Sequence, residues 1–278
     1  MLDQATTNDI IETLNALRSQ EETCYCTRNG VYCDPSTPID SKCRELMVGW
    51  CYRIADHCSY NHNTVTIAVN NLDRLVEVMP EILESKRKFQ LAVMTCLYNA
   101  VKTHEPIAIG PKAMARLSKG VFTAEDYERF EMILLSRLKW RVNAPTPATF
   151  AQLFMKLVPL HQPGVLEQQT SKLIQYQIDH ATTCSDFLGL TAYELAYQAT
   201  CNAISVIHPC AYQIVNKSIG PFGNTQLLSS QTNDALLDLV TAGPKYGTTG
   251  YLFGGASSPP AMSQTSIAHL SPRTVTLR

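Results

Sequence analysis

Apolar residues recur at helical spacing through the middle of the chain, and the alternation that marks a β-strand is nearly absent. Residues 43–58, "CRELMVGWCYRIADHC", place their large apolar side chains on one helical face. Residues 63–79, "NTVTIAVNNLDRLVEVM", do the same, so each segment is predicted to bury one face. Residues 89–102 are apolar on nearly all sides, which predicts a central helix surrounded by others.

Turn and capping residues divide this pattern into elements. Pro111 suits the first turn of a short helix, and Thr123 is a predicted N-cap with an acidic residue three positions later. The next helix must end at "NAPTP", residues 143–147, because its two prolines cannot continue a helix. We place a domain boundary there, with the Thr-Pro step of this motif as the cap and first-turn residue of the following helix.

A second helical set follows the boundary, and its third member begins with Thr191 and Glu194 at capping-box spacing. Its predicted helices are 147–158, 164–185, 191–207, a weaker one at about 209–218, and 230–241. The patterns predict an all-α fold of two five-helix bundles in tandem, the second more degenerate. The predicted parts are an N-terminal helix with a Cys-containing connector (1–38), an N-terminal domain (39–144), a C-terminal domain (145–242) and a disordered tail (243–278).

Composition narrows the class of protein. Apolar residues make up 45% of the chain, charged residues 17%, and the net charge is −1. This balance argues against nucleic-acid binding as the main activity, since that needs a concentrated positive surface. The N-terminus lacks the pattern of a secretory signal, and no stretch reaches the ~18 apolar residues of a membrane span. We therefore expect an intracellular protein that binds neither nucleic acid nor a membrane.

Ten cysteines raise the question of a metal site. Cys24, Cys26 and Cys33 cluster in "TCYCTRNGVYC", but the spacings do not form the paired knuckles of a zinc site. We interpret the cysteines as reduced thiols, mostly buried, and predict no metal or other cofactor. Zinc binding or redox sensing by this cluster, with His57 and Cys58, stays an alternative.

Four charges interrupt the apolar faces of the N-terminal domain: Arg44, Asp73, Lys102 and Glu131. Each one alone could extend its charged end to water. Together they offer two pairs of opposite sign, one within the core and one at the end of the central helix. A buried unpaired charge is costly, and breaking a buried pair costs ~3–5 kcal/mol. The sequence therefore predicts that Arg44 pairs with Asp73 and joins the first helix of the domain to the second.

Four stretches of the sequence resemble the cyclin box in order and spacing: "CRELMVGW", "TVTIAVNNLDRLV", "FQLAVMTCLYNAVK" and "MILLSRLKWRVNAPTPATF". Arg44 to Asp73 and Lys102 to Glu131 are each 29 residues apart, as in that family. The wording of "LKWRVNAPTP" and neighbouring stretches is most similar to cyclins expanded in diatoms. The resemblance is strong over about 39–155, weak over 156–242 and absent from the tail.

The resemblance implies two cyclin folds without catalytic activity of their own, and a cyclin-dependent kinase as the partner. It implies that Lys102 and Glu131 contact the main chain of the kinase, and that Trp140 and Val142 pack against the kinase's regulatory helix. For Trp140, an ordinary core position is the alternative. Asn99 and Thr103 also belong to this predicted contact, at positions where many cyclins carry a larger apolar residue. Arg44, Asp73 and Leu91 take the family's structural positions.

A second candidate surface follows from the same resemblance. Its residues match the hydrophobic patch on which cyclins dock substrate peptides: Cys43, Leu46, Met47, Trp50, Arg53 and Gln90. Cys43 replaces the usual methionine. Arg53 stands where a glutamate often receives the arginine of a docking peptide, so we expect it to repel such peptides.

The leading hypothesis from the sequence is a regulatory subunit that activates a cyclin-dependent kinase in the cell cycle, located in nucleus and cytoplasm. A cyclin-fold transcription scaffold is the alternative, but it would call for a zinc ribbon and a basic surface. The cysteine spacing and the net charge of −1 favour neither feature.

Overall fold

The structure is a computed structural model that describes residues 3–27, 32, 34–158, 164–209, 217–222 and 230–241, without the side chains of 165 and 230–233. Every regular element within these ranges is a helix, which confirms the all-α prediction. The predicted tail, residues 243–278, lies outside the described residues, as does most of the weak helix predicted at 209–218. None of the described helices is long and apolar enough to cross a membrane.

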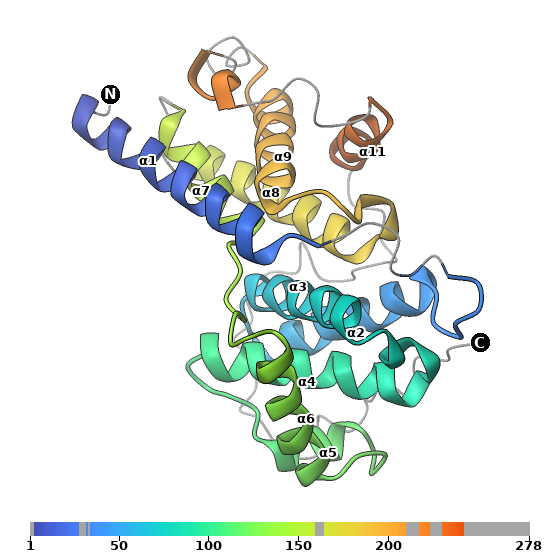
Figure 1. Cartoon of the computed structure of the whole chain (residues 1–278). Coiled ribbons are helices and arrows are strands. Elements are labelled where there is room, and N and C mark those ends of the chain that lie inside the picture. Colours follow the sequence, from blue (N-terminus) through green and yellow to red (C-terminus); the bar gives the residue numbers. More distant parts are fainter. Residues whose placement is uncertain are drawn as a thin grey trace. The chain divides into compact units, whose positions relative to one another are not determined.

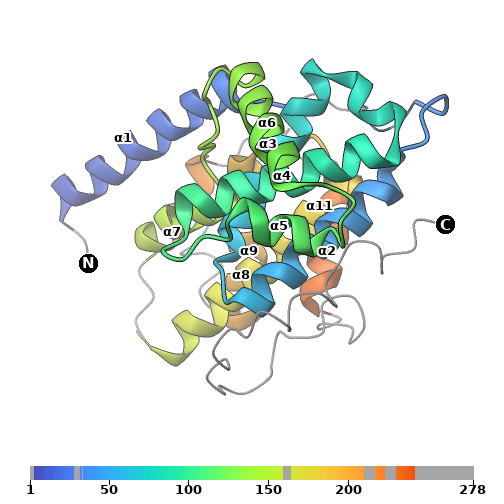
Figure 2. The same ribbon diagram turned by 90° about the horizontal axis from the view of Figure 1, so that it is seen from below.

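The described residues form two compact units. We call the described residues from Thr27 to Ala144 the first bundle. The second bundle combines the described residues up to Cys26 with those from Pro145 onward, so the N-terminal helix is part of the second unit. The helices of each bundle can be followed in Figure 1 and, turned by 90°, in Figure 2.

The first bundle is arranged around one central helix. Its helices are α2 (Ser41–Cys58), α3 (His62–Val78), α4 (Lys86–His104), α5 (Pro111–Leu117) and α6 (Ala124–Arg137), with a short 3-10 helix, η2 (Pro80–Glu84). In Figure 1, α4 lies between α2 and α3 on one side and α5 and α6 on the other, and it contacts all four. Every residue of α4 from Ala92 to Val101 is buried, which confirms the predicted central helix.

Local side-chain contacts set the helix starts where the sequence predicted them. The Thr123 hydroxyl accepts from the backbone N–H of Asp126 at 3.2 Å, and the Asp126 carboxylate accepts from the N–H of Thr123 at 2.9 Å. This reciprocal capping box starts α6. Pro111 occupies the first turn of α5.

Helix α3 differs from its predicted pattern. The spacing predicted one buried face, but every residue from Thr64 to Val76 except Asn70 is buried. The prediction is wrong here because polar side chains can also be buried when they have partners inside the protein. The Thr64 hydroxyl, for example, donates to the Glu105 carboxylate at 2.5 Å.

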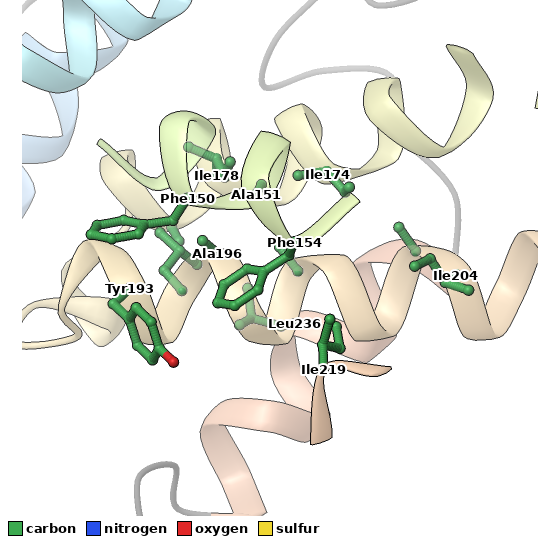
Figure 3. Packing of buried hydrophobic residues seen from close by; sticks show 14 of the residues in the cluster. Phe150, Ala151, Phe154, Ile174, Ile178, Tyr193, Ala196, Ile204, Ile219 and Leu236 are labelled. Atoms are coloured by element: carbon green, nitrogen blue, oxygen red, sulfur yellow. The ribbon is translucent and has the colours of Figure 1, made fainter. Parts of the chain in front are cut away.

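The second bundle surrounds an aromatic core. Its α-helices are α1 (Gln4–Gln20), α7 (Pro147–Leu157), α8 (Val165–Thr183), α9 (Ala192–Ile207) and α11 (Ser230–Thr241). It also contains a short π-helix, η1 (Glu21–Tyr25), and two 3-10 helices, η3 (Ser185–Phe187) and η5 (Gly220–Phe222). Phe150 and Phe154 of α7 point toward Tyr193 of α9, edge to face at 5.4 Å (Figure 3). Ile10 and Leu14 of α1 enter the same core. The predicted caps of α7 and α9, Thr146 and Thr191, are both present.

A buried carboxylate joins the end of α1 to the start of α9. Glu21, 6% exposed, accepts from the backbone N–H groups of Ala192 and Tyr193 in the first turn of α9. The Arg18 guanidinium lies 4.7 Å from the centre of the Tyr193 ring. Burial raises the pKa of Glu21 to about 7, although the two hydrogen bonds from the main chain favour its charged form. Nothing in the sequence pattern predicted this contact.

Replacement of Glu21 by glutamine should change how stability depends on pH. Because the pKa of Glu21 is raised from 4.5 to about 7 on folding, its favourable contribution is complete below pH 4.5 and is lost as the pH rises through about 7. The glutamine carbonyl can still accept from the N-terminus of α9 but carries no charge. From pH 5 to pH 8, the wild type should lose unfolding free energy on the order of 1–3 kcal/mol through Glu21. The Glu21→Gln variant should not show this loss.

Urea unfolding of both proteins across this pH range measures the difference. Glu22→Gln is the matched control, since Glu22 lies beside Glu21 but makes an exposed ion pair with Arg18 at 2.9 Å. Parallel stability curves for the wild type and Glu21→Gln would contradict the expected coupling.

Candidate functional site

The ion pair predicted between Arg44 and Asp73 is present and joins α2 to α3. Arg44 Nε donates to Asp73 Oδ1 at 2.9 Å, and Nη2 donates to Oδ2 at 2.7 Å. The two side chains are 3% and 12% exposed, so this bidentate pair lies inside the first bundle. Burial of Arg44 opposes its charged form, but Asp73 outweighs this effect and raises the pKa of the guanidinium.

Tyr32 completes this pair and was not predicted. Its hydroxyl donates to Asp73 Oδ1 at 2.8 Å, and its ring lies 5.8 Å from the Arg44 guanidinium carbon. The same ring packs edge to face on Phe89 of α4 at 6.2 Å. Burial and the Asp73 charge raise the pKa of Tyr32, which keeps its hydroxyl protonated as a donor. Three helices of the first bundle thus meet at one polar cluster.

A second pair of opposite charges lies at the surface. Lys102 Nζ, at the end of α4, lies 3.2 Å and 3.1 Å from the two carboxylate oxygens of Glu131 on α6. The Lys102 side chain is 51% exposed and that of Glu131 is 9% exposed. The ammonium also lies 5.6 Å from the centre of the Tyr98 ring.

Partial burial opposes the charged form of Lys102, but the hydrogen bond and charge of Glu131 outweigh it and raise the pKa of the ammonium. Lys102 therefore stays a cation with exposed N–H donors, held in place by a carboxylate that is largely covered. This arrangement can donate to main-chain carbonyl groups of a partner protein.

Asn99 is buried beside this pair and binds Glu131. It was predicted at the contact surface, but it is 2% exposed and its side-chain amide donates to Glu131 Oε1 at 3.0 Å. Because it is this deeply buried, Asn99 can act on a partner mainly through Glu131. The Thr103 hydroxyl turns back to the Asn99 and Ala100 carbonyl groups of its own helix, at 2.9 Å and 3.1 Å.

The two apolar residues of the predicted contact differ in exposure. Trp140 is 68% exposed, which excludes the core position that its size could suggest. Val142 is half-buried, and its carbonyl accepts from the Asn71 side chain at 3.0 Å. Other large apolar side chains exposed on α6 are Met132 and Ile133, which directly follow Glu131. Exposed apolar groups of this size are typical of interaction surfaces.

The predicted docking patch is mostly internal in this structure. Met47 and Trp50 are each 1% exposed, and Cys43 is 9% exposed. Leu46 and Gln90 are half-buried, whereas Arg53 is exposed. Leu91, predicted as a structural residue, is half-buried on α4. The docking role of this patch stays a prediction, and only its charged and partly covered members could touch a peptide here.

The structure also locates most of the cysteines. Eight of the ten are described, and none of these eight forms a disulfide. Burial raises the pKa of the Cys51 thiol to about 12, so this thiol is protonated. Among the described residues, no three His, Cys, Asp or Glu side chains gather as a metal site would require. Cys33, a member of the proposed cluster, lies outside the described residues.

Comparison with known proteins adds the family. Residues 12–143 match the family model described as Cyclin, N-terminal domain. This segment belongs to the cyclin family. It is 25% identical to G1/S-specific cyclin-D1 of Homo sapiens over 146 residues, which cover 52% of this chain and 48% of that protein. It is 29% identical to Cyclin-G1 of Homo sapiens over 181 residues, which cover 62% of this chain and 60% of that cyclin.

Solved structures extend the similarity of fold beyond this segment. A viral cyclin from herpesvirus saimiri superimposes with a TM-score of 0.59 and 13% identity, over 89% of this chain and 97% of that cyclin. A chain of the CAK complex of Chaetomium thermophilum bound to ATP-gamma-S gives 0.51 and 13%, over 87% and 75%. At this identity the likeness shows the cyclin fold alone. The chain spans about half the length of the cyclin-D1 proteins that it matches.

Removal of one member of the buried pair should destabilise this cyclin strongly. Arg44→Met leaves the Asp73 carboxylate buried without its cation, and we expect a loss of about 3–5 kcal/mol of unfolding free energy. Chemical denaturation measured by circular dichroism gives this value. The double variant Arg44→Met, Asp73→Asn should be less destabilised, because it removes both charges and keeps an acceptor for Tyr32.

An exposed pair in the same bundle provides the control. Lys88 and Glu84 lie 2.8 Å apart with side chains 52% and 64% exposed, so Lys88→Met should cost less than about 1 kcal/mol. A similar loss in Arg44→Met and Lys88→Met would show that burial of the first pair does not matter for stability.

Proposed function

We propose that this cyclin is the regulatory subunit of a cyclin-dependent protein kinase, and that it binds and activates the kinase to control progression through the cell cycle. The observation that carries the proposal is the Lys102–Glu131 pair, a half-exposed cation fixed by a largely covered carboxylate on a second helix. The names of the relatives support the cell-cycle assignment, since cyclin-D1 is described as G1/S-specific. The fold shared with a chain of the CAK complex bound to ATP-gamma-S supports a kinase partner.

The geometry suits recognition of another protein's main chain. The Lys102 ammonium offers donors to carbonyl groups, and the carboxylate of Glu131 can accept from amide N–H groups. Asn99 holds the Glu131 carboxylate, and Glu131 in turn holds the Lys102 ammonium, so little side-chain freedom is lost on binding. The exposed Trp140 adds a large apolar contact of the kind that often dominates interface energies.

Activation of the kinase would follow from the site on the kinase that this surface binds. In the proposed complex it holds the kinase's regulatory helix, whose glutamate then pairs with the lysine that binds ATP. The cyclin contributes no group to phosphoryl transfer in this scheme. The cyclin keeps the kinase in its active arrangement by binding that arrangement more tightly than the inactive one.

Reversal of the charge at Lys102 should abolish kinase binding while the fold persists. Lys102→Glu places a second carboxylate beside Glu131 and removes the donors, so affinity should fall by about 100-fold or more. Calorimetry or surface plasmon resonance against a panel of purified cyclin-dependent kinases measures the loss. Phosphorylation of a generic substrate by the same kinases reports on activation.

Lys88→Glu is the matched control for this experiment. Lys88 lies on the same helix, α4, is 52% exposed and also contacts a carboxylate, but it lies at the opposite end of the helix. It should bind and activate the kinase normally. Full binding by a folded Lys102→Glu variant would remove the main support for the proposed function.

A further inference from the structure

The charged residue next to Asp73 has a different partner. Asp73 faces Arg44, whereas Arg74 Nη1 donates to the Arg141 carbonyl at 2.7 Å, in the segment that follows α6. The Arg74 side chain is buried with the rest of its residue, which is 8% exposed. Successive residues of a helix point about 100° apart, so α3 can bind different elements through neighbouring positions.

Asn71, one turn before Arg74, binds the same segment. Its side-chain amide donates to the Val142 carbonyl at 3.0 Å, and its oxygen accepts from Arg74 Nη1 at 3.5 Å. Asn71 is 0% exposed. Two buried side chains of α3 thus bind two successive main-chain carbonyl groups, those that directly follow Trp140.

The backbone at Trp140 is one that an L-amino acid rarely adopts. Lys139 and Trp140 have φ values of +53° and +62°, in the left-handed region that favours glycine. The turn is closed on its helix side by the Trp140 N–H, which donates to the Leu135 carbonyl at 2.8 Å. Two consecutive strained residues persist only where the surroundings hold them. On the C-terminal side of the turn, Arg74 and Asn71 bind the main chain of the two residues that directly follow it, Arg141 and Val142.

We propose that Arg74 and Asn71 are positioning residues that hold the Trp140 side chain outward, as a fixed aromatic contact for the kinase. The first step, control of the Trp140 position, depends only on the geometry of the first bundle. The second step, an effect on kinase affinity, rests on the proposed function. The same α3 helix then fixes both the internal Arg44–Asp73 pair and the exposed aromatic residue.

The chain offers a direct readout of the first step, because it contains two tryptophans of opposite exposure. Trp50 is 1% exposed and Trp140 is 68% exposed. In full-length protein labelled with 5-fluorotryptophan, ¹⁹F NMR should give one signal for each, and Trp140→Phe identifies the second. The Trp50 signal then reports on the fold and the Trp140 signal on the turn.

Arg74→Met should shift or broaden the Trp140 signal and leave that of Trp50 unchanged, because the Arg141 carbonyl loses its donor. Arg74→Lys, which keeps a cationic donor, should give a smaller change. Arg137→Met is the control, since Arg137 is an exposed arginine in the last turn of α6. An unchanged Trp140 signal in folded Arg74→Met would overturn the proposal.

Two further measurements keep the result decisive. If Arg74→Met also moves the Trp50 signal, Asn71→Ala takes its place, with the same expected and opposing outcomes.

For the second step, the effect on kinase affinity, Arg74→Met should weaken kinase binding about fivefold or more in the wild type, but less than about twofold in a Trp140→Ala background. Equal losses in both backgrounds would refute action through Trp140. If no kinase binds the wild type, the proposed function fails while the ¹⁹F result still decides the positioning role.

Discussion

The first bundle depends on how two opposite charges are kept away from water. Removal of a guanidinium and a carboxylate from solvent is favourable only if their hydrogen bonds are satisfied. Arg44 and Asp73 meet this condition with two short bonds to each other and a third from Tyr32. The geometry of these bonds fixes α3 against α2. Tyr32 extends the contact to α4, because its ring packs on Phe89 of that helix. The other polar contacts of α3, including those at the end of α6, follow from this fixed position.

The second pair has the same sequence separation and a similar chemistry but a different environment. Lys102 keeps half of its side chain in solvent, whereas Arg44 is 3% exposed. Because exposed charges contribute little to stability, the half-exposed Lys102 fits the proposed role in recognition better than a structural one. Their fixed geometry and available donors suit recognition, in which an ordered group loses less freedom on binding. Exposure therefore separates the structural pair from the pair for which we propose a role in recognition.

Local patterns were enough to predict the helices of the first bundle, the starts of α5 and α6 and the central position of α4. The Arg44–Asp73 pair was also predictable, because two opposite charges on apolar faces have few other solutions. Contacts to the main chain were not, since a carbonyl group at Arg141 or an N–H at Ala192 leaves no mark in the sequence. For Trp140 the resemblance implied a kinase contact, with an ordinary core position as the alternative, because the left-handed turn at this residue leaves no mark in the sequence. The burial of Asn99 and its hydrogen bond to Glu131 of α6 left no mark in the sequence either.

The two bundles also differ in the groups that their polar side chains bind. In the first bundle, two of the polar contacts join charged side chains directly: Arg44 with Asp73, and Lys102 with Glu131. In the second bundle, Glu21 binds main-chain N–H groups and Gln177 donates to the Ala199 carbonyl, groups that almost any residue can supply. Its apolar core needs only suitable volume and shape. Such a bundle can keep its fold while its sequence changes.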